Sequence, residues 1–261
     1  MLYLWLNVLL AFIVGAFWIA MASTAADRFG SKLGGLIGGM PSMIMIALVF
    51  IGLSQGITPA LETAYAFPIA YGATVLFLLA YAVICRRNQL AAMGAAFAIW
   101  IAISTVAIAF RIDDPVYGIT FYLITYLFCY IAMVKVLKIP SLGKATFKST
   151  TRQRIVRSIL GGAVIAFVVF VSRVAGPVYG GIFGGFPIVF SSLLIISYKT
   201  GGAKFSRAIA KSLALTGIST TIYIVAIIYL YPAYGVVAGT ISGYLITILC
   251  GALIYKYLKG V

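Results

Sequence analysis

Two stretches of this sequence repeat a pattern that is hostile to a helix: "GGLIGGMP" at Gly34–Pro41 and "GGIFGGFP" at Gly180–Pro187. Both read Gly-Gly-x-x-Gly-Gly-x-Pro, and they lie 146 positions apart. Proline removes a backbone hydrogen-bond donor and clashes with the carbonyl four residues earlier, while glycine makes the backbone easy to unwind. Each stretch therefore predicts a break in a helix, and their repetition predicts two related halves.

The composition indicates that lipid is the solvent for most of the chain. The 261 residues are 64% hydrophobic and only 9% charged, whereas a soluble domain is about half apolar and a quarter charged. A spanning helix needs roughly 20 apolar residues. We therefore expect an all-α multi-pass protein of the cell membrane.

Hydropathy predicts about nine spans separated by loops that contain glycine, proline or charge. The expected spans are Leu2–Met21, Gly35–Leu53, Ala64–Ile84, Leu90–Phe110, Gly118–Leu137, Ile155–Val174, Gly180–Ile196, Leu213–Leu230 and Val236–Leu258.

The basic residues divide unequally between the two sides of such a membrane domain. With nine spans, 17 of the lysines and arginines fall on one side, and Arg111 and Arg173 fall on the other. Because lysine and arginine favour the cytoplasmic side, we expect the N-terminus outside and the C-terminus inside. The net charge of +15 is then explained by topology and attraction to membrane lipids, and a nucleic-acid partner is not expected.

Missing residue types exclude several functions. The chain has no histidine and four acidic residues, Asp27, Glu62, Asp113 and Asp114. Imidazole-based metal sites and Ser-His-Asp or Cys-His catalysis cannot be built from this composition. We therefore expect no metal, no cofactor and no enzymatic activity, and the absence of a mid-span carboxylate leaves the coupling ion open.

A shift of 146 residues aligns more than the glycine-proline stretches. It also aligns Gly15 with Gly161, Gly30 with Gly176, and Gly56 with Gly202. Four spans then match four later spans, with one span left between them. The expected units are a first repeat at 1–117, a connector helix with a basic loop at 118–150, and a second repeat at 151–261. Five spans reverse the membrane orientation, so this is a 4+1+4 inverted-topology repeat, as in many secondary transporters.

The repeated stretches are the candidate site, and three interpretations stay open. They can be broken helices that line a substrate cavity, since irregular backbone in a membrane is tolerated against protein or water. They can be small-residue packing faces, or an interface in a homodimer. In the first case a half-helix begins at each proline and points its N–H groups at a ligand, favouring anions. The candidate residues are Gly34, Gly35, Gly38, Gly39, Pro41, Ser42, Gly180, Gly181, Gly184, Gly185, Pro187 and Ser191.

Further polar residues allow more than one interpretation. Asp27 and Arg173 are equivalent under the shift and have opposite charges, so they form a possible charged pair or gate, although both lie near span ends, where an interfacial position is the simpler explanation. The run Ser219–Thr221 lies in mid-span and is more typical of interhelical hydrogen bonding. Tyr71 and Tyr223 can line a cavity or belong to an interfacial belt.

The segment Ser172–Tyr198, "SRVAGPVYGGIFGGFPIVFSSLLIISY", with "KFSRAIAKS" after it, resembles the GlpM-like family of small four-helix bacterial inner-membrane proteins. The first half shows the resemblance more faintly, with "GGMPS" in place of the Phe-Pro form. The resemblance implies a fusion of two four-helix units and implies no activity.

The sequence therefore predicts a secondary transporter of a small solute that works by alternating access between two inverted repeats. A lipid or lipid-linked flippase is the alternative within transport. A structural or assembly protein whose glycine faces bind partner helices is the alternative outside it.

Overall fold

The computed structural model describes residues 2–38, 41–141 and 150–258, with side chains described over 3–24, 41–141 and 150–253. The described residues form helices and no strands. The helices are α1 (Leu2–Gly38), α2 (Ser42–Gln55), α3 (Ile57–Ile84), α4 (Gln89–Ala109), α5 (Pro115–Tyr130) with a π-helical continuation (Ile131–Val136), α6 (Thr151–Val174), α7 (Pro177–Gly184), α8 (Ile188–Thr216) and α9 (Ile218–Leu258).

Side-chain caps fix several helix starts at the expected loops. The Asn88 side chain accepts bonds from the backbone N–H groups of Leu90 and Ala91, and Asp114 accepts one from Val116. Thr150 and Gln153 form a capping box at the start of α6. Each cap satisfies backbone donors that the first turn leaves free.

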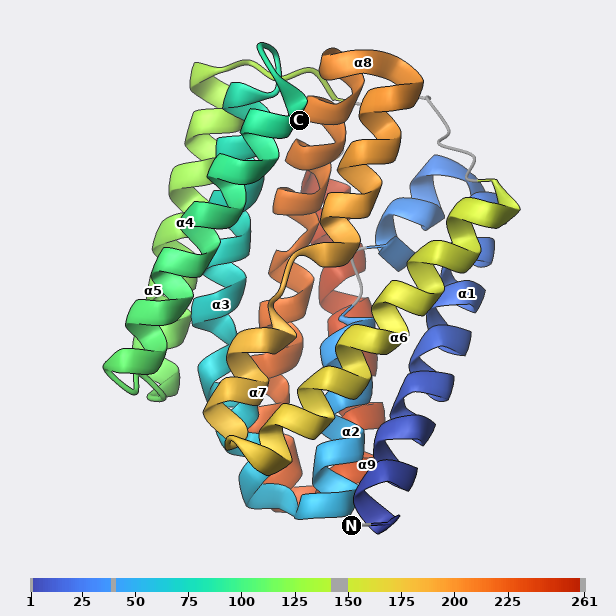
Figure 1. Ribbon diagram of the computed structural model, residues 1–261, viewed down its shortest axis with the longest axis vertical. Helices are drawn as coiled ribbons and strands as arrows, with labels where there is room; N and C mark the ends of the chain where they lie inside the picture. The colour runs from blue at the N-terminus through green and yellow to red at the C-terminus, as the bar shows by residue number, and fades with distance from the viewer. Residues whose placement is uncertain (1, 39–40, 142–149, 259–261) are drawn as a thin grey trace.

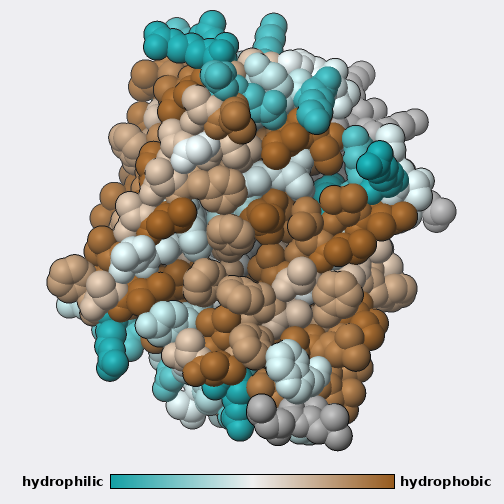
Figure 2. Space-filling view, in the orientation of Figure 1, coloured by the Kyte–Doolittle hydropathy of each residue, from teal (hydrophilic) through white to brown (hydrophobic). Residues whose placement is uncertain are grey.

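The molecule is built for a membrane. In its described part, six helices are long and apolar enough to cross one, and large apolar side chains such as Leu90, Phe110 and Leu249 are exposed. Figure 2 shows a broad apolar middle with hydrophilic side chains gathered toward the ends. The all-α membrane prediction is therefore confirmed in this coarse form.

The bounds of the expected second and seventh spans differ from those of the helices. Helix α1 runs on to Gly38, through the charged segment expected to be a loop, and α2 has only 14 residues. Expected span seven is divided between α7 and α8. The expected boundary at 117/118 also falls inside α5, which begins at Pro115.

Charged side chains are distributed unequally along the long axis. The N-terminus and C-terminus lie at opposite ends (Figure 1). Described basic residues at the α3–α4 turn, the end of α5, the start of α6 and the bend of α8 all face the C-terminal end. Exposed Arg111, Asp113, Asp114 and Arg173 lie at turns of the opposite end.

Helix α3 is the centre of the fold. It is 78% buried over its most apolar part and packs against α4, α5 and α7, and Figure 1 shows it within the bundle. Helix α1 packs chiefly on α6, and the two run in opposite directions along the long axis (Figure 1).

Backbone irregularities recur at positions that lie 146 residues apart. Gly56 has φ 103° and ψ 171°, and Gly202, 146 positions later, has φ 67° and ψ −170°. Pro41 precedes α2 with φ −75° and ψ 40°, and Pro187 precedes α8 with φ −82° and ψ 27°. The positive φ values explain glycine at both bends, since other residues rarely adopt them.

Contacts between α1 and α6 are reciprocal. A Cβ atom at Gly15 would lie 2.6 Å from Cδ1 of Ile165, and one at Gly161 would overlap Cδ1 of Ile19. Gly161 and Ile165 each lie 146 positions after Gly15 and Ile19. Each helix thus supplies the same two positions of the 146-residue shift to this contact.

Candidate functional site

The second glycine-proline stretch does interrupt the helix. Helix α7 ends at Gly184, and Gly185 and Phe186 close it with N–H bonds to Ile182 O (3.1 Å) and Phe183 O (3.0 Å). Helix α8 then begins, with Pro187 O accepting from Ser191 N at 2.8 Å. Pro187 is thus the N-cap of α8, and the first helical residue is Ile188. The sequence analysis expected Pro187 itself to be the first helical residue.

Glycines in α7, and Gly185 directly after it, let this helix approach α3 closely. A Cβ atom at Gly181 would overlap the backbone oxygen of Thr63 and lie 2.8 Å from Cβ of Ala66. One at Gly185 would lie 2.7 Å from Cβ of Ala70. Gly180 meets Ser172 of α6 in the same way. These glycines therefore act as packing residues in this arrangement.

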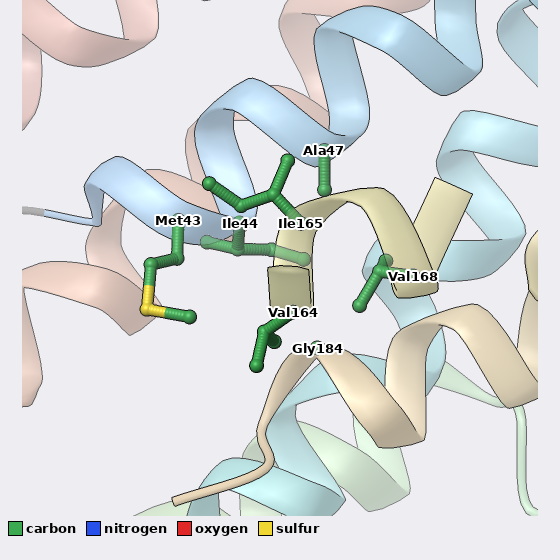
Figure 3. Close-up of a pocket in the computed structure, with 7 residues that line it drawn as sticks. All are labelled: Met43, Ile44, Ala47, Val164, Ile165, Val168 and Gly184. Atoms are coloured by element: carbon green, nitrogen blue, oxygen red, sulfur yellow. The ribbon is translucent and has the colours of Figure 1, made fainter. Parts of the chain in front are cut away.

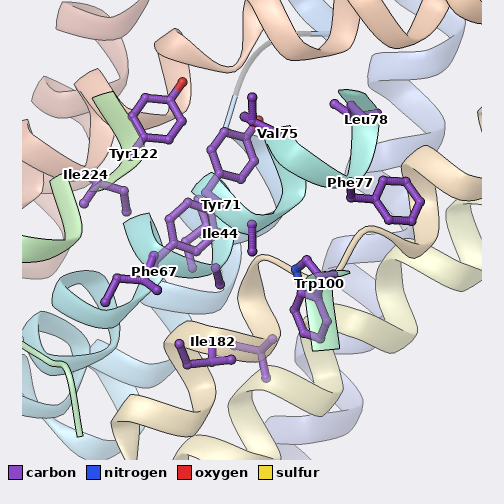
Figure 4. Packing of buried hydrophobic residues seen from close by; sticks show 14 of the residues in the cluster. Ile44, Phe67, Tyr71, Val75, Phe77, Leu78, Trp100, Tyr122, Ile182 and Ile224 are labelled. Atoms are coloured by element: carbon purple, nitrogen blue, oxygen red, sulfur yellow. The ribbon is translucent and has the colours of Figure 1, made fainter. Parts of the chain in front are cut away.

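A threonine of α3 satisfies the backbone that the break leaves free. The Thr74 hydroxyl donates to the carbonyl of Gly185 and accepts from Nε1 of Trp100 at 3.1 Å. The Trp100 ring packs edge-on against Phe186, with centroids 5.1 Å apart. Figure 4 shows Trp100 within the buried cluster. The sequence prediction did not include Thr74 or Trp100.

The first stretch breaks at the matching place. Gly34, Gly35 and Gly38 belong to α1, but their surroundings lie outside the described side chains, and Gly39 lies outside the described residues altogether. Helix α2 begins at Ser42, and Met45 N donates to Pro41 O at 2.9 Å.

The two breaks meet at a shallow apolar hollow that is too narrow to hold a water molecule. We call it the central hollow, and it is lined by Met43, Ile44, Ala47, Val164, Ile165, Val168 and Gly184 (Figure 3). It joins the first turns of α2, the middle of α6 and the last residue of α7. An open shared cavity is therefore not what this arrangement shows, and the apolar lining offers no polar side chain to an anion.

The two predicted serines differ in their surroundings. Ser191 is buried, and its hydroxyl donates to Pro187 O at 2.8 Å within its own helix. Ser42 is half-buried in the first turn of α2. Ser191 is therefore a helix-start residue in this arrangement.

Asp27 and Arg173 lie on helices α1 and α6, and the side chain of Asp27 is outside the described side chains. Ala16 and Gly162 touch where α1 and α6 cross, and each charged residue lies 11 positions beyond that contact on oppositely directed helices. At about 1.5 Å per residue, their Cα atoms are roughly 30 Å apart. Arg173 is exposed, as its interfacial interpretation predicts, and a gate role for either residue stays a prediction.

Two contacts join residues that are equivalent under the shift. A Cβ atom at Gly162 would lie 2.9 Å from Cβ of Ala16, and one at Gly217 would lie 3.0 Å from Cε1 of Tyr71. The members of each pair are 146 positions apart. We call these the axis contacts, because residues that are equivalent under the shift would meet on the axis of a two-fold relation.

Aromatic rings and hydroxyls surround the second axis contact. The Tyr71 ring stacks between Phe67 (5.2 Å) and Tyr122 (5.8 Å), and Figure 4 shows the three rings side by side. Thr220, the counterpart of Thr74, donates weakly to the Tyr71 hydroxyl at 3.5 Å.

Comparisons with known proteins match part of the chain. Residues 8–114 match a family model described as a protein of unknown function (DUF3147). This is less than half of the chain, and it covers most of α1 with α2, α3 and α4. No curated protein and no solved structure matches. Within the described residues, no group of histidine, cysteine and acidic side chains could hold a metal ion.

Proposed function

We propose that this protein is a secondary transporter of a small solute, in which two inverted halves exchange between an inward-open and an outward-open arrangement. The observation that carries the proposal is the pair of axis contacts, Ala16–Gly162 and Tyr71–Gly217. A broken helix from each half lies beside them at the central hollow.

Inverted symmetry supplies a physical reason for alternating access. Two halves with the same fold, packed upside down to each other, can exchange their conformations, and the result is a mirror arrangement of similar energy. The end of the DUF3147 match at Asp114, directly before α5, supports treating α1 to α4 as one such unit. The resemblance of the second half to the GlpM-like family supports the same division.

The proposed orientation places the basic end in the cytoplasm and the N-terminus outside, in the plasma membrane. It rests on the gathering of lysines and arginines at the C-terminal end (Figures 1 and 2) and on the preference of these residues for the cytoplasmic side.

A structural role is the second candidate, and one observation favours it. Gly180, Gly181 and Gly185 are packed against α6 and α3 with no room for a methyl group, as in helices that serve only to associate. A structural protein of this kind does not need to change between two conformations.

The transporter and the structural protein should differ in whether water reaches the Tyr71–Gly217 contact. Thr220 is 5% exposed, and Thr220→Cys in a background without native cysteines should react with an impermeant thiol reagent added on either side of lipid vesicles. Thr247→Cys, equally buried in α9 with its hydroxyl bonded to Gly243 O, should stay unreactive. Reaction of both cysteines, or of neither, would remove the transport proposal.

The same vesicles test the orientation. Exposed Thr151→Cys should react only from the cytoplasmic side, and exposed Asp113→Cys only from outside. Among the native thiols, Cys85 is buried, and burial raises the pKa of its thiol; the nearby Arg207 guanidinium opposes this only in part.

A further inference from the structure

Two arginines from different parts of the chain lie together at the basic end of the molecule. Arg207 of α8 is half-buried, and Arg86 is exposed in the turn between α3 and α4. Their positive charges are close enough to repel each other, and both lie near the buried Cys85. Two like charges side by side are unfavourable unless a negative charge joins them.

The Arg207 guanidinium is held in place by the end of α3. Its Nε donates to the carbonyl oxygen of Ala82 at 2.8 Å, and α3 ends two residues later, at Ile84. The last four carbonyls of a helix have no partner within it, so this bond caps α3. A guanidinium carries five N–H donors in a fixed planar fork, and the cap uses only one of them.

The described carboxylates are far from this pair. In the parts of the chain whose side chains are described, the acidic residues are Glu62, Asp113 and Asp114. Glu62 lies near the start of α3 and the two aspartates lie between α4 and α5, both at the opposite end of the molecule (Figure 1). An anion from outside the chain is therefore the partner that the two arginines fit.

Exposed apolar side chains flank the arginines. Val83 is 47% exposed and Leu90 is 82% exposed, and they come three residues before and four residues after Arg86 in the sequence. Figure 2 shows hydrophilic side chains at this end directly above apolar ones. An anion held here has water on one side and hydrocarbon on the other, as the phosphate of a membrane lipid does.

We propose that Arg86 and Arg207 bind the phosphate of an anionic phospholipid at the basic end of the molecule. Guanidinium groups match the geometry of phosphate oxygens and donate paired hydrogen bonds to them. The acyl chains of the lipid would lie along Val83 and Leu90. The site joins the α3–α4 turn to α8, and lipid binding there does not depend on transport.

The test measures lipid binding by native mass spectrometry of the purified protein in detergent. The probes are phosphatidylglycerol and, with the same acyl chains, zwitterionic phosphatidylcholine. Inorganic phosphate is added as a competitor, because it has the anion without the chains.

Two variants remove the proposed contacts. Arg86→Gln removes one charge, and Arg207→Lys keeps the charge but lacks the fork that reaches Ala82 and a phosphate together. The control is Arg87→Gln, which removes the same charge from the exposed neighbour of Arg86. If Arg207→Lys loses stability with the cap of α3, the exposed Arg86→Gln still tests the site.

We expect wild type and Arg87→Gln to prefer phosphatidylglycerol over phosphatidylcholine. Arg86→Gln and Arg207→Lys should bind phosphatidylglycerol about tenfold more weakly than wild type, as the loss of a hydrogen bond to a charged group predicts. Without lipid, Arg86→Gln should melt no lower than wild type, because the change removes a repulsion.

Three results would overturn the site. Equal binding of the two lipids by wild type would show that it does not select an anion. Equal binding of phosphatidylglycerol by Arg86→Gln and Arg87→Gln would show only diffuse surface charge. Displacement of phosphatidylglycerol by an equal concentration of inorganic phosphate would show a site for a soluble anion and not for a lipid.

Discussion

Gly181→Ala should lower the free energy of unfolding by about 3 kcal/mol, at the upper end of the usual cost of overpacking. The added Cβ would overlap the Thr63 carbonyl oxygen and lie 3.1 Å from the Phe67 backbone N. Backbone atoms on a central helix cannot rotate away as a side chain can, so α7 must move off α3. Thermal unfolding in detergent measures the effect.

Gly94→Ala is the matched control. Gly94 lies on the exposed side of α4, and nothing lies within 4 Å of its added Cβ. Alanine is favoured over glycine in a helix by about 1 kcal/mol, so this variant should be as stable as wild type or slightly more so. Equal melting of the two variants would contradict the close docking of α7 on α3.

Thr74→Val should destabilise the protein by about 2–4 kcal/mol with almost no change in side-chain volume. It leaves the Gly185 carbonyl and the Trp100 indole N–H without the partner they share, and each unpaired buried group costs about 1–3 kcal/mol. For a chain of this size the melting temperature should fall by roughly 5–15 °C.

Thr247→Val is the comparison for this loss. Thr247 is equally buried, but its hydroxyl bonds only to a carbonyl of its own helix, Gly243 O. The change should therefore cost less than about 1 kcal/mol. If both variants melt together, the Thr74 hydroxyl does not hold the second break closed.

The local features of this fold could be predicted from the sequence because they depend on single residues. Pro41 and Pro187 each remove a backbone hydrogen-bond donor directly after glycines that unwind easily, so the sequence indicated both interruptions. The bends at Gly56 and Gly202 follow from the conformational freedom of glycine, and their spacing of 146 residues is visible in the sequence.

Hydropathy predicted the wrong helix ends where charged residues interrupt the apolar sequence. It predicted a loop at the charged segment after Met21, but α1 continues through it to Gly38. A charged residue changes hydropathy without ending a helix. The turn expected around Pro232 is likewise a bend inside α9, where Gly235 has φ 76°.

The candidate site was only half predictable, because its polar residues depend on which helices become neighbours. Thr74 and Trp100 each look like ordinary membrane-helix residues in the sequence. The roles of Thr74 and Trp100 arise when α7 docks on α3. A polar residue within an apolar helix was the available signal in the sequence.

The exchange between two arrangements can be observed with spin labels at both ends. Arg87 and Lys204 are exposed at the basic end, and their counterparts 146 positions away, Ala233 and Thr58, are exposed at the opposite end. Pulsed electron resonance in lipid nanodiscs measures the distance within Arg87→Cys/Lys204→Cys and within Thr58→Cys/Ala233→Cys. Gly184→Ala, which crowds Ile44 at 3.0 Å, and its counterpart Gly38→Ala perturb one break each.

If the halves exchange conformations, each pair should show two distances, and the two alanine changes should shift their populations in opposite directions, opening one end while closing the other. A single distance at each end, unchanged by either alanine, would contradict alternating access and leave a rigid helix-packing protein.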